Sequence, residues 1–133
     1  MPDKTIETIN PLTERVLQVY PVMSDDEAFG VVEKCHEAFL KWRLRSLDER
    51  AAVISAIAAE LRRSSPEFAQ LMTDEVGKLL SDSLSEIELC ASICDYTAKN
   101  GPKYLADEAR EVPEGRGLVT YSPLGVIYGI QPW

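Results

Sequence analysis

Three cysteines and a single histidine are the side chains best suited to nucleophilic or metal chemistry in this sequence. Cys90 and Cys94 are four residues apart, so on a helix they face the same way and could share a metal ion. Zinc sites need further ligands, usually from tight pairs on loops, and His36 falls on another predicted helix beside apolar positions. Buried core positions for Cys35, Cys90 and Cys94 are therefore favoured, and we predict that no metal is bound. His36 is expected on a helix surface, with no histidine relay.

Glu75 and Lys78 form a second candidate pair, three residues apart on either side of Gly77. Their spacing fits an ion pair at a helix end, worth a few tenths of a kcal/mol. Gly77 is the residue expected to end that helix. We favour a structural role for all three residues.

The segment 123–133 contains an apolar run between Pro-Leu-Gly and Pro-Trp. This pattern is typical of a β-strand buried on both faces. Such a strand must form hydrogen bonds with neighbouring strands, and no suitable parallel partner follows. We therefore expect these 133 residues to be the first part of a larger protein.

Four Ser-x-x-Glu pairs indicate where the positioning helices begin, because serine and glutamate in this spacing form a capping box. Apolar residues at helical spacing follow each pair, which predicts four amphipathic helices joined by short connections. The pairs are Ser24/Glu27, Ser46/Glu49, Ser64/Glu67 and Ser83/Glu86. Pro66 suits the first turn of the third helix, and Gly101-Pro102 is expected to end the fourth.

Extended structure is expected on both sides of the helices. Residues 6–22 predict a β-hairpin with its turn at 10–14. Residues 111–117 are rich in turn formers, and Leu118–Tyr121 predicts a short strand. Ser122-Pro123 then forms a corner between that strand and the apolar run.

Composition and charge narrow the class of protein. Hydrophobic residues make up 45% and charged residues 27% of the chain, which are ordinary globular values. The net charge of −8 disfavours nucleic acid or an anionic membrane as the partner. The sequence shows no signal-peptide pattern and no apolar run of the ~20 residues that cross a membrane. An odd number of cysteines without a compact framework suits a reducing cytoplasm.

Several segments resemble the aldehyde dehydrogenase family, in family order along nearly the whole chain. The matching segments are PLGVI at 123–127, GIQPW at 129–133, TDEVGK at 73–78 followed by Glu86, CDYTA at 94–98 followed by Gly101-Pro102 and Leu105, and INPLTE at 9–14. The segment from Cys94 is most similar to the bacterial succinate-semialdehyde dehydrogenases. Glu14-Arg15 replaces the Gly-Glu that is usual in the family's first turn.

The resemblance implies an α/β parent fold, of which this chain is the N-terminal portion. Residues 1–105 then form the hairpin and the helical part of the cofactor-binding domain. Residues 106–122 belong to an oligomerisation arm through which a homo-oligomer forms, and 123–133 are the first strand of the nucleotide-binding sheet.

The resemblance also implies a reaction, the oxidation of an aldehyde to a carboxylic acid with NAD or NADP as cofactor. The substrate expected from the similarity is succinate semialdehyde. In the family a cysteine thiolate attacks the aldehyde, but that cysteine comes far downstream, so none of the three cysteines here takes its place. We therefore expect no catalytic residue in this chain, which would be inactive alone.

Cofactor contacts are implied at the end of the final strand, at Ile130, Gln131, Pro132 and Trp133. This agrees with ligand binding at the carboxyl ends of strands in α/β sheets. The fourth helix is expected to line the aldehyde tunnel with some residues between Glu86 and Tyr96. Two alternatives stay open: a non-enzymatic helical interaction domain, and an aldehyde dehydrogenase acting on another aldehyde, such as a betaine, lactaldehyde or aromatic aldehyde.

Overall fold

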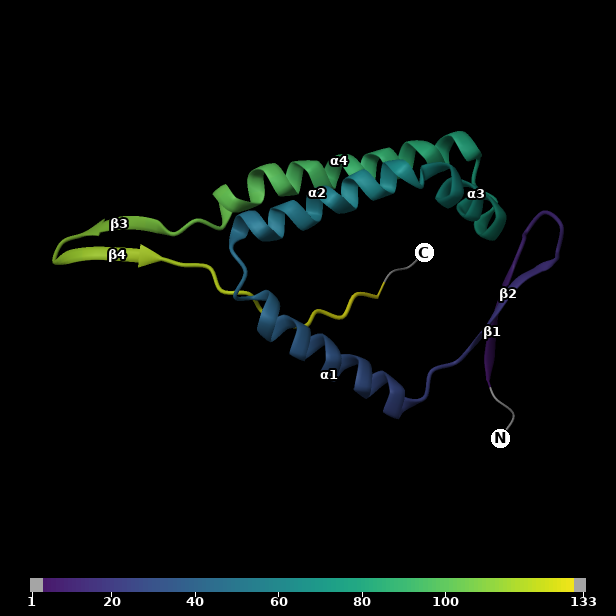
Figure 1. Cartoon of the computed structure of the whole chain (residues 1–133), viewed down its shortest axis with the longest axis horizontal. Coiled ribbons are helices and arrows are strands. Elements are labelled where there is room, and N and C mark those ends of the chain that lie inside the picture. The colour runs from purple at the N-terminus through teal and green to yellow at the C-terminus, as the bar shows by residue number, and fades with distance from the viewer. Residues whose placement is uncertain (1–3, 131–133) are drawn as a thin grey trace.

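Two β-hairpins lie at opposite ends of a helical centre (Figure 1). The structure is a computed structural model that describes residues 4–130. In chain order the elements are β1 (Thr5–Ile9), β2 (Val16–Pro21), α1 (Asp25–Trp42), α2 (Leu47–Arg63), α3 (Ser65–Val76), α4 (Leu80–Tyr104), β3 (Glu108–Val112) and β4 (Gly115–Val119). Four helices with two small strand pairs confirm the predicted α/β composition of this portion.

The first hairpin forms as predicted. β1 and β2 pair in antiparallel fashion, with Thr5 opposite Pro21 and a register shift between Thr8 and Ile9. The Asn10 side chain closes the turn by accepting hydrogen bonds from the amides of Leu12 and Thr13, both at 3.0 Å.

The first two predicted capping boxes are confirmed and the last two are wrong. Ser24 and Ser46 each accept a bond from the amide three residues on, and Glu27 and Glu49 bond back to the serine amides. These bonds lower the pKa of both glutamates, since they favour the charged carboxylate. Ser64 precedes α3 without a capping bond, because its hydroxyl donates to Glu60 instead, at 3.1 Å.

Ser83 lies inside α4, whose N-cap is Leu79, so it cannot cap that helix. Gly77 ends α3, as predicted, in the left-handed conformation with φ 70°. α4 then begins at Leu80, ahead of Ser83. The predicted end at Gly101-Pro102 is wrong. α4 continues to Tyr104, since a proline in the last turn removes only one amide and Leu105 N still bonds Gly101 O at 3.0 Å.

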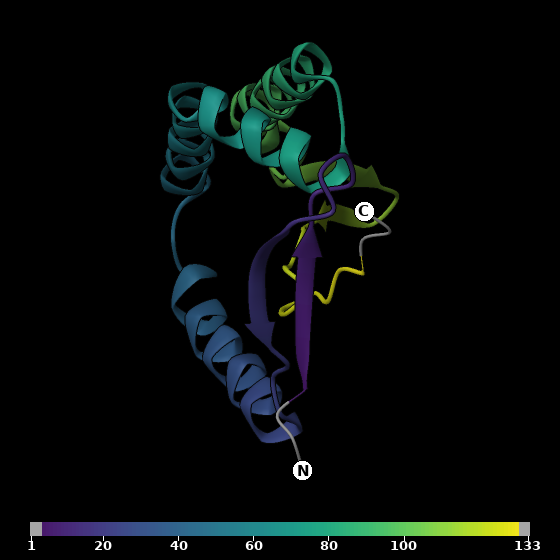
Figure 2. The same cartoon turned by 90° about the vertical axis from the view of Figure 1, so that its right-hand side faces the viewer.

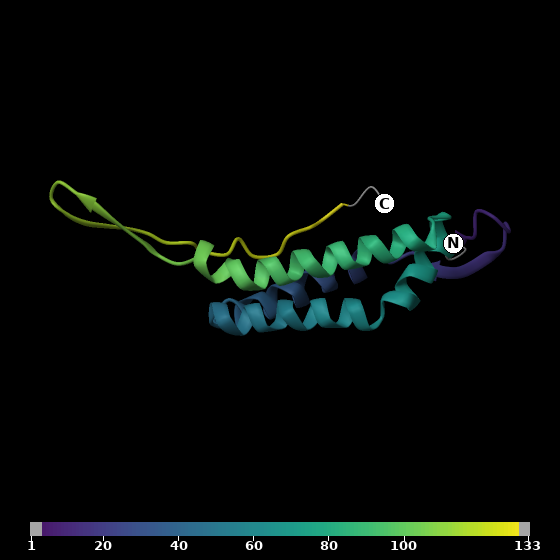
Figure 3. The same cartoon turned by 90° about the horizontal axis from the view of Figure 1, so that it is seen from above.

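The packed core lies between α4 and the two helices beside it. α2 and α4 run antiparallel side by side, and α3 crosses α4 near its start (Figures 1 and 3). Small side chains allow the close approach of these helices. The buried residues are Ala58 on α2, Ser64 between α2 and α3, Ala69 on α3, and Ser83, Ile87 and Ala91 on α4.

One arginine ties α2 to α4 along the surface. Arg62 donates from Nη2 to Glu88 at 2.8 Å and contacts Asp95 through Nη1 at 2.8 Å. The Arg62 hydrogen bond lowers the pKa of Glu88, and the bonds to Glu88 and Asp95 raise the pKa of Arg62.

α1 stands apart from the other helices and has no buried residue (Figures 1 and 2). Its predicted apolar face is only partly covered within residues 4–130, by the segment 125–127 beside Phe39. The predicted burial of Cys35 and Cys90 is wrong here, because both are exposed, and Cys94 is half-buried. No other element of the described portion covers the faces that carry the two exposed thiols.

The segment 120–130 runs as extended chain and forms no strand. The strand predicted over 123–133 is thus not formed in its described part. Its hydrogen-bond ladder needs a neighbouring strand, and none of the four strands of residues 4–130 pairs with it.

A second hairpin projects from the helical centre, where only a turn-rich stretch at 111–117 and one strand at 118–121 were predicted (Figures 1 and 3). β3 and β4 pair from Glu108 opposite Val119 to Val112 opposite Gly115, with the turn at Pro113-Glu114. β3 was not predicted, because its sequence, EAREV, is mostly charged and lacks the apolar alternation of a strand. None of the helices in residues 4–130 has the length and apolar character needed to cross a membrane.

Candidate functional site

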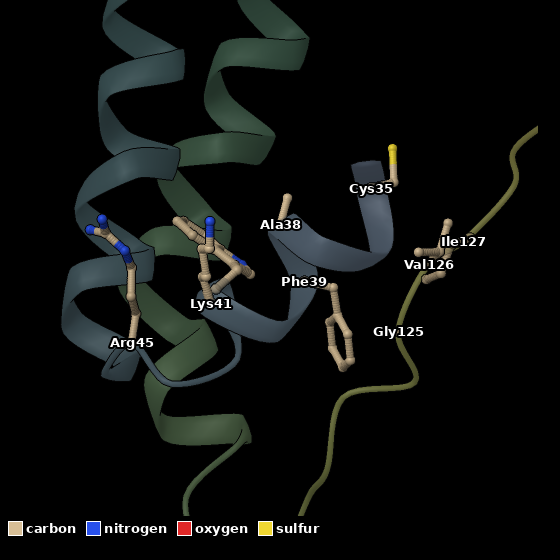
Figure 4. Close-up of a pocket in the computed structure, with 9 residues that line it drawn as sticks. Cys35, Ala38, Phe39, Lys41, Arg45, Gly125, Val126 and Ile127 are labelled. Carbon is tan, nitrogen blue, oxygen red and sulfur yellow. The ribbon is translucent and has the colours of Figure 1, made fainter. Parts of the chain in front are cut away.

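A groove with a volume of about 570 Å³ lies between α1 and the extended segment (Figure 4). The Phe39 side chain lies between the helix and Gly125. A Cβ added to Gly125 would be 3.9 Å from the Phe39 ring. The groove is lined by Cys35, Ala38, Phe39, Lys41, Trp42, Arg45, Gly125, Val126 and Ile127. Its volume falls within the range of small-molecule sites.

Aromatic rings and cations together give the groove its chemical character. The Arg43 guanidinium lies 5.9 Å from the Phe39 ring centre, and that of Arg45 lies 5.7 Å from the Trp42 ring. Both distances fit cation–π contacts, which hold the rings in place. The lining contains no Asp, Glu or His, and its apolar and cationic side chains offer a binding surface.

The predicted cofactor residues lie outside this groove or outside the described chain. Ile130 is 82% exposed and is not among the groove residues. Gln131, Pro132 and Trp133 lie outside residues 4–130. No glycine-rich phosphate loop leading into a helix accompanies Ile130 in the described part of the chain. The described residues therefore do not build a complete dinucleotide site.

The other candidate side chains are dispersed. His36 is on the surface of α1, as predicted, with its ring centre 6.1 Å from that of Phe39. Within residues 4–130 no three His, Cys, Asp or Glu side chains come together as metal ligands. Lys78 pairs with Glu86 rather than with Glu75, because the loop after Gly77 carries Lys78 to the start of α4.

The outer face of α4 carries an exposed apolar row that the sequence did not resolve. Leu89, Ile93 and Tyr96 are exposed, whereas Ile87 and Ala91 face the core. The Tyr96 and Tyr104 hydroxyls lie 2.9 Å apart, and this hydrogen bond raises the pKa of Tyr104. The spacing of four and three residues could have identified this row, but apolar residues on both faces of α4 obscured it.

The groove residues were also missed, although a signal for them exists. Phe39 and Trp42 are three residues apart and stand beside the basic residues Lys41, Arg43 and Arg45. Aromatic residues that alternate with cations at the end of a helix can form cation–π contacts at a binding surface.

The chain is similar in sequence to proteins that are named succinate-semialdehyde dehydrogenases. It is 35% identical over 132 residues to a succinate-semialdehyde dehydrogenase [NADP(+)] of Deinococcus radiodurans, covering 99% of this chain and 28% of the relative. It is 34% identical to the succinate semialdehyde dehydrogenase [NAD(P)+] Sad of Escherichia coli K12, covering 95% of this chain and 27% of the relative. The chain thus spans little more than a quarter of these relatives.

Solved structures agree with the sequence comparison. A succinic semialdehyde dehydrogenase of Streptococcus pyogenes, solved with NADP+, superposes with a TM-score of 0.78 and 34% identity over 84% of this chain and 25% of that one. An indole-3-acetaldehyde dehydrogenase of P. syringae, solved with NAD+, gives a TM-score of 0.83 and 29% identity over 92% of this chain and 25% of that one. The sequence profile of the aldehyde dehydrogenase family matches residues 1–133, and this chain therefore belongs to the aldehyde dehydrogenase family.

Proposed function

We propose that this chain is the N-terminal part of an oxidoreductase that converts succinate semialdehyde to the carboxylic acid with NAD(P)+. The observation that carries the proposal is the 35% identity over 99% of the chain to a succinate-semialdehyde dehydrogenase. A relative solved with NADP+ supports the cofactor class. The three free cysteines agree with the cytoplasmic location that we propose.

Within this proposal the chain lines the binding sites of the dinucleotide and the aldehyde but contributes no reacting group. Ile130, Gln131, Pro132 and Trp133 would contact the dinucleotide, which supplies the hydride acceptor when bound. The outer row of α4, with Leu89, Ile93 and Tyr96, would face the aldehyde. An exposed row of apolar side chains can exclude water from a bound substrate.

The chain alone is proposed to be inactive. Aldehyde oxidation through a thiol needs a thiolate and a base in reach of each other. The groove that Cys35 lines contains no Asp, Glu or His to act as that base. Purified chain mixed with succinate semialdehyde and NAD+ or NADP+ should form no reduced nicotinamide, and turnover by a pure sample would refute this part.

A chimera tests the function itself. The segment of the Deinococcus radiodurans relative that aligns with this chain is replaced by residues 1–133, and oxidation of succinate semialdehyde is measured with NADP+ and with NAD+. We expect activity with a preference for succinate semialdehyde over acetaldehyde and indole-3-acetaldehyde. A folded chimera that prefers either competing aldehyde would contradict the proposed substrate, and a folded but inactive chimera would contradict the function.

We further propose that the second hairpin joins copies of the parent protein. Support comes from its projection beyond the helical centre and from the exposure of Val112 and Leu118 (Figure 1). Both outer edges of the two-stranded sheet lack a partner among residues 4–130. In the chimera, Leu118→Lys should lower the sedimentation coefficient, while Leu12→Lys at the first hairpin should leave it unchanged.

A further inference from the structure

Arg50 lies where the first turn of α2, the end of α4 and the corner at Tyr121–Pro123 meet. Its side chain lines two cavities. The larger, of about 250 Å³, is also lined by Leu47, Leu105, Tyr121, Ser122 and Pro123. The smaller, of about 90 Å³, continues between α2 and α4 past Thr97. Arg50 therefore stands at the junction of three segments that are far apart in the sequence.

The Nε–H group of Arg50 has no hydrogen-bond acceptor. This nitrogen is out of contact with solvent, and nothing in the described part of the chain accepts a bond from it. A guanidinium cannot relieve the loss by releasing its proton, since it stays charged throughout the pH range of folded proteins. Arg62, Arg63 and Arg110 differ, because each pairs with a carboxylate on the surface.

The cavity linings contain donors but no acidic side chain. Apart from Arg50, the larger cavity offers the hydroxyl groups of Tyr121 and Ser122. The Tyr121 hydroxyl already donates to Glu108 at 3.0 Å, and Glu108 also pairs with Arg110. Glu108, the carboxylate that Tyr121 contacts, is thus already engaged, which leaves Arg50 and Ser122 for another group.

We infer that the cavity beside Arg50 binds a carboxylate group, with the guanidinium as the principal donor and the Ser122 hydroxyl as the second. A carboxylate matches the fork of Nε and Nη, which can donate two parallel bonds to its two oxygens. The chain's net charge of −8 favours a group of low charge over a polyphosphate.

For the chain by itself the carboxylate can come from a small free acid or from an Asp or Glu of a second copy, and one experiment on the chain separates the two. The chain is labelled with ¹⁵N, and the Nε–Hε signal of Arg50 is assigned by its loss in Arg50→Lys. Sodium succinate is then added at an ionic strength matched with sodium chloride. In a second series the protein is diluted without any added acid.

A free acid shifts the Arg50 signal saturably with succinate and not with chloride. Followed at the Ser122 amide, Arg50→Lys should weaken succinate binding about tenfold, because lysine keeps the charge and loses the fork. Ser122→Ala should weaken it about threefold. Arg15→Lys, on the turn of the first hairpin, is the matched control and should change nothing.

If the Arg50 signal does not shift with succinate but shifts on dilution, the carboxylate belongs to a second copy. This outcome equally supports the inference. A signal that responds to neither overturns it, as does succinate binding that is equally strong in Arg50→Lys. If Arg50→Lys does not fold, the wild-type titration and Ser122→Ala still decide, because unchanged binding in Ser122→Ala together with an unmoved Nε–Hε signal overturns the inference.

Discussion

Glu14 holds a backbone conformation that residues with a side chain rarely adopt, with φ 59° in the turn of the first hairpin. This conformation costs most residues about 1–2 kcal/mol, and glycine avoids the cost. The aldehyde dehydrogenase pattern that residues 9–14 resemble usually has glycine at this position. We predict that Glu14→Gly raises the free energy of unfolding by about 0.5–1 kcal/mol, after the greater freedom of glycine in the unfolded chain is subtracted. Denaturant unfolding measures the change, and Glu7→Gly, within β1, should instead destabilise.

Ser83 is fully buried on α4, and its hydroxyl has no hydrogen-bond partner in the described part of the chain. Ser83→Ala removes an unpaired polar atom and should leave stability unchanged or raise it by about 1 kcal/mol. A helix cap would behave in the opposite way and lose about 1 kcal/mol on the same substitution. Ser46→Ala, at a confirmed cap, is the comparison, and an equal loss in both variants would contradict the placement of Ser83.

The Arg62 bridge should make stability depend on pH in a defined direction. The pKa of Glu88 in the folded chain lies below its ordinary value of 4.5, chiefly because Arg62 donates hydrogen bonds to it. Its contribution is therefore fully present above pH 4.5 and is lost as the pH falls through the lower, folded value. Arg62→Gln should lower the melting temperature at pH 7, and the difference from wild type should shrink in acid. Arg15→Gln should show no such difference, and a gap that widens in acid would contradict the bridge.

At the scale of the elements, local patterns predicted helices well and their ends less well. Ser24 and Ser46 follow loops that leave both serines free to cap, so the pattern alone sufficed. Ser64 stands at the N-cap of α3, but its hydroxyl donates to Glu60 instead of capping. Ser83 lies inside α4, because α3 ends at Gly77 and α4 begins at Leu80. The groove beside α1 could not be predicted, since it joins residues 35–45 to 125–127 through tertiary structure that no local spacing encodes.

Gly77 ends α3 and lies against the tip of the first hairpin, so it links two elements. A Cβ at this position would sit 3.1 Å from Pro11 Cγ. A residue with a side chain would also have to adopt φ 70° here. Gly77→Ala should therefore lower the free energy of unfolding by about 1–2 kcal/mol. Gly30→Ala is the matched control in the middle of α1, where an added Cβ meets nothing within 4 Å. That variant should be more stable by about 1 kcal/mol, and a similar loss in both would contradict the proposed difference.

The whole molecule exposes far more surface than a compact protein of its mass. Its accessible area is 11263 Å², whereas a compact monomer of 14.8 kDa has about 7,000 Å². The excess comes from the projecting hairpins and from α1 with the extended segment beside it (Figure 2). Small-angle scattering of the monomer should give a radius of gyration well above the ~14 Å of a compact chain this long. A value near 14 Å would show that α1 folds back onto the other helices.

Uneven local stability follows from this shape and can be measured residue by residue. The amides of α2 and α4 are held by helical bonds and by the packing of Ala58, Ile87 and Ala91, so their hydrogen exchange should be slowest. Amides from Val126 to Ile130 make no strand pairing in the described chain and should exchange at nearly the unfolded rate. β3 and β4 pair only with each other and should lie between these limits. Strong protection of Val126–Ile130 in a verified monomer would contradict this order and would favour a self-contained helical domain over a wall of a larger enzyme.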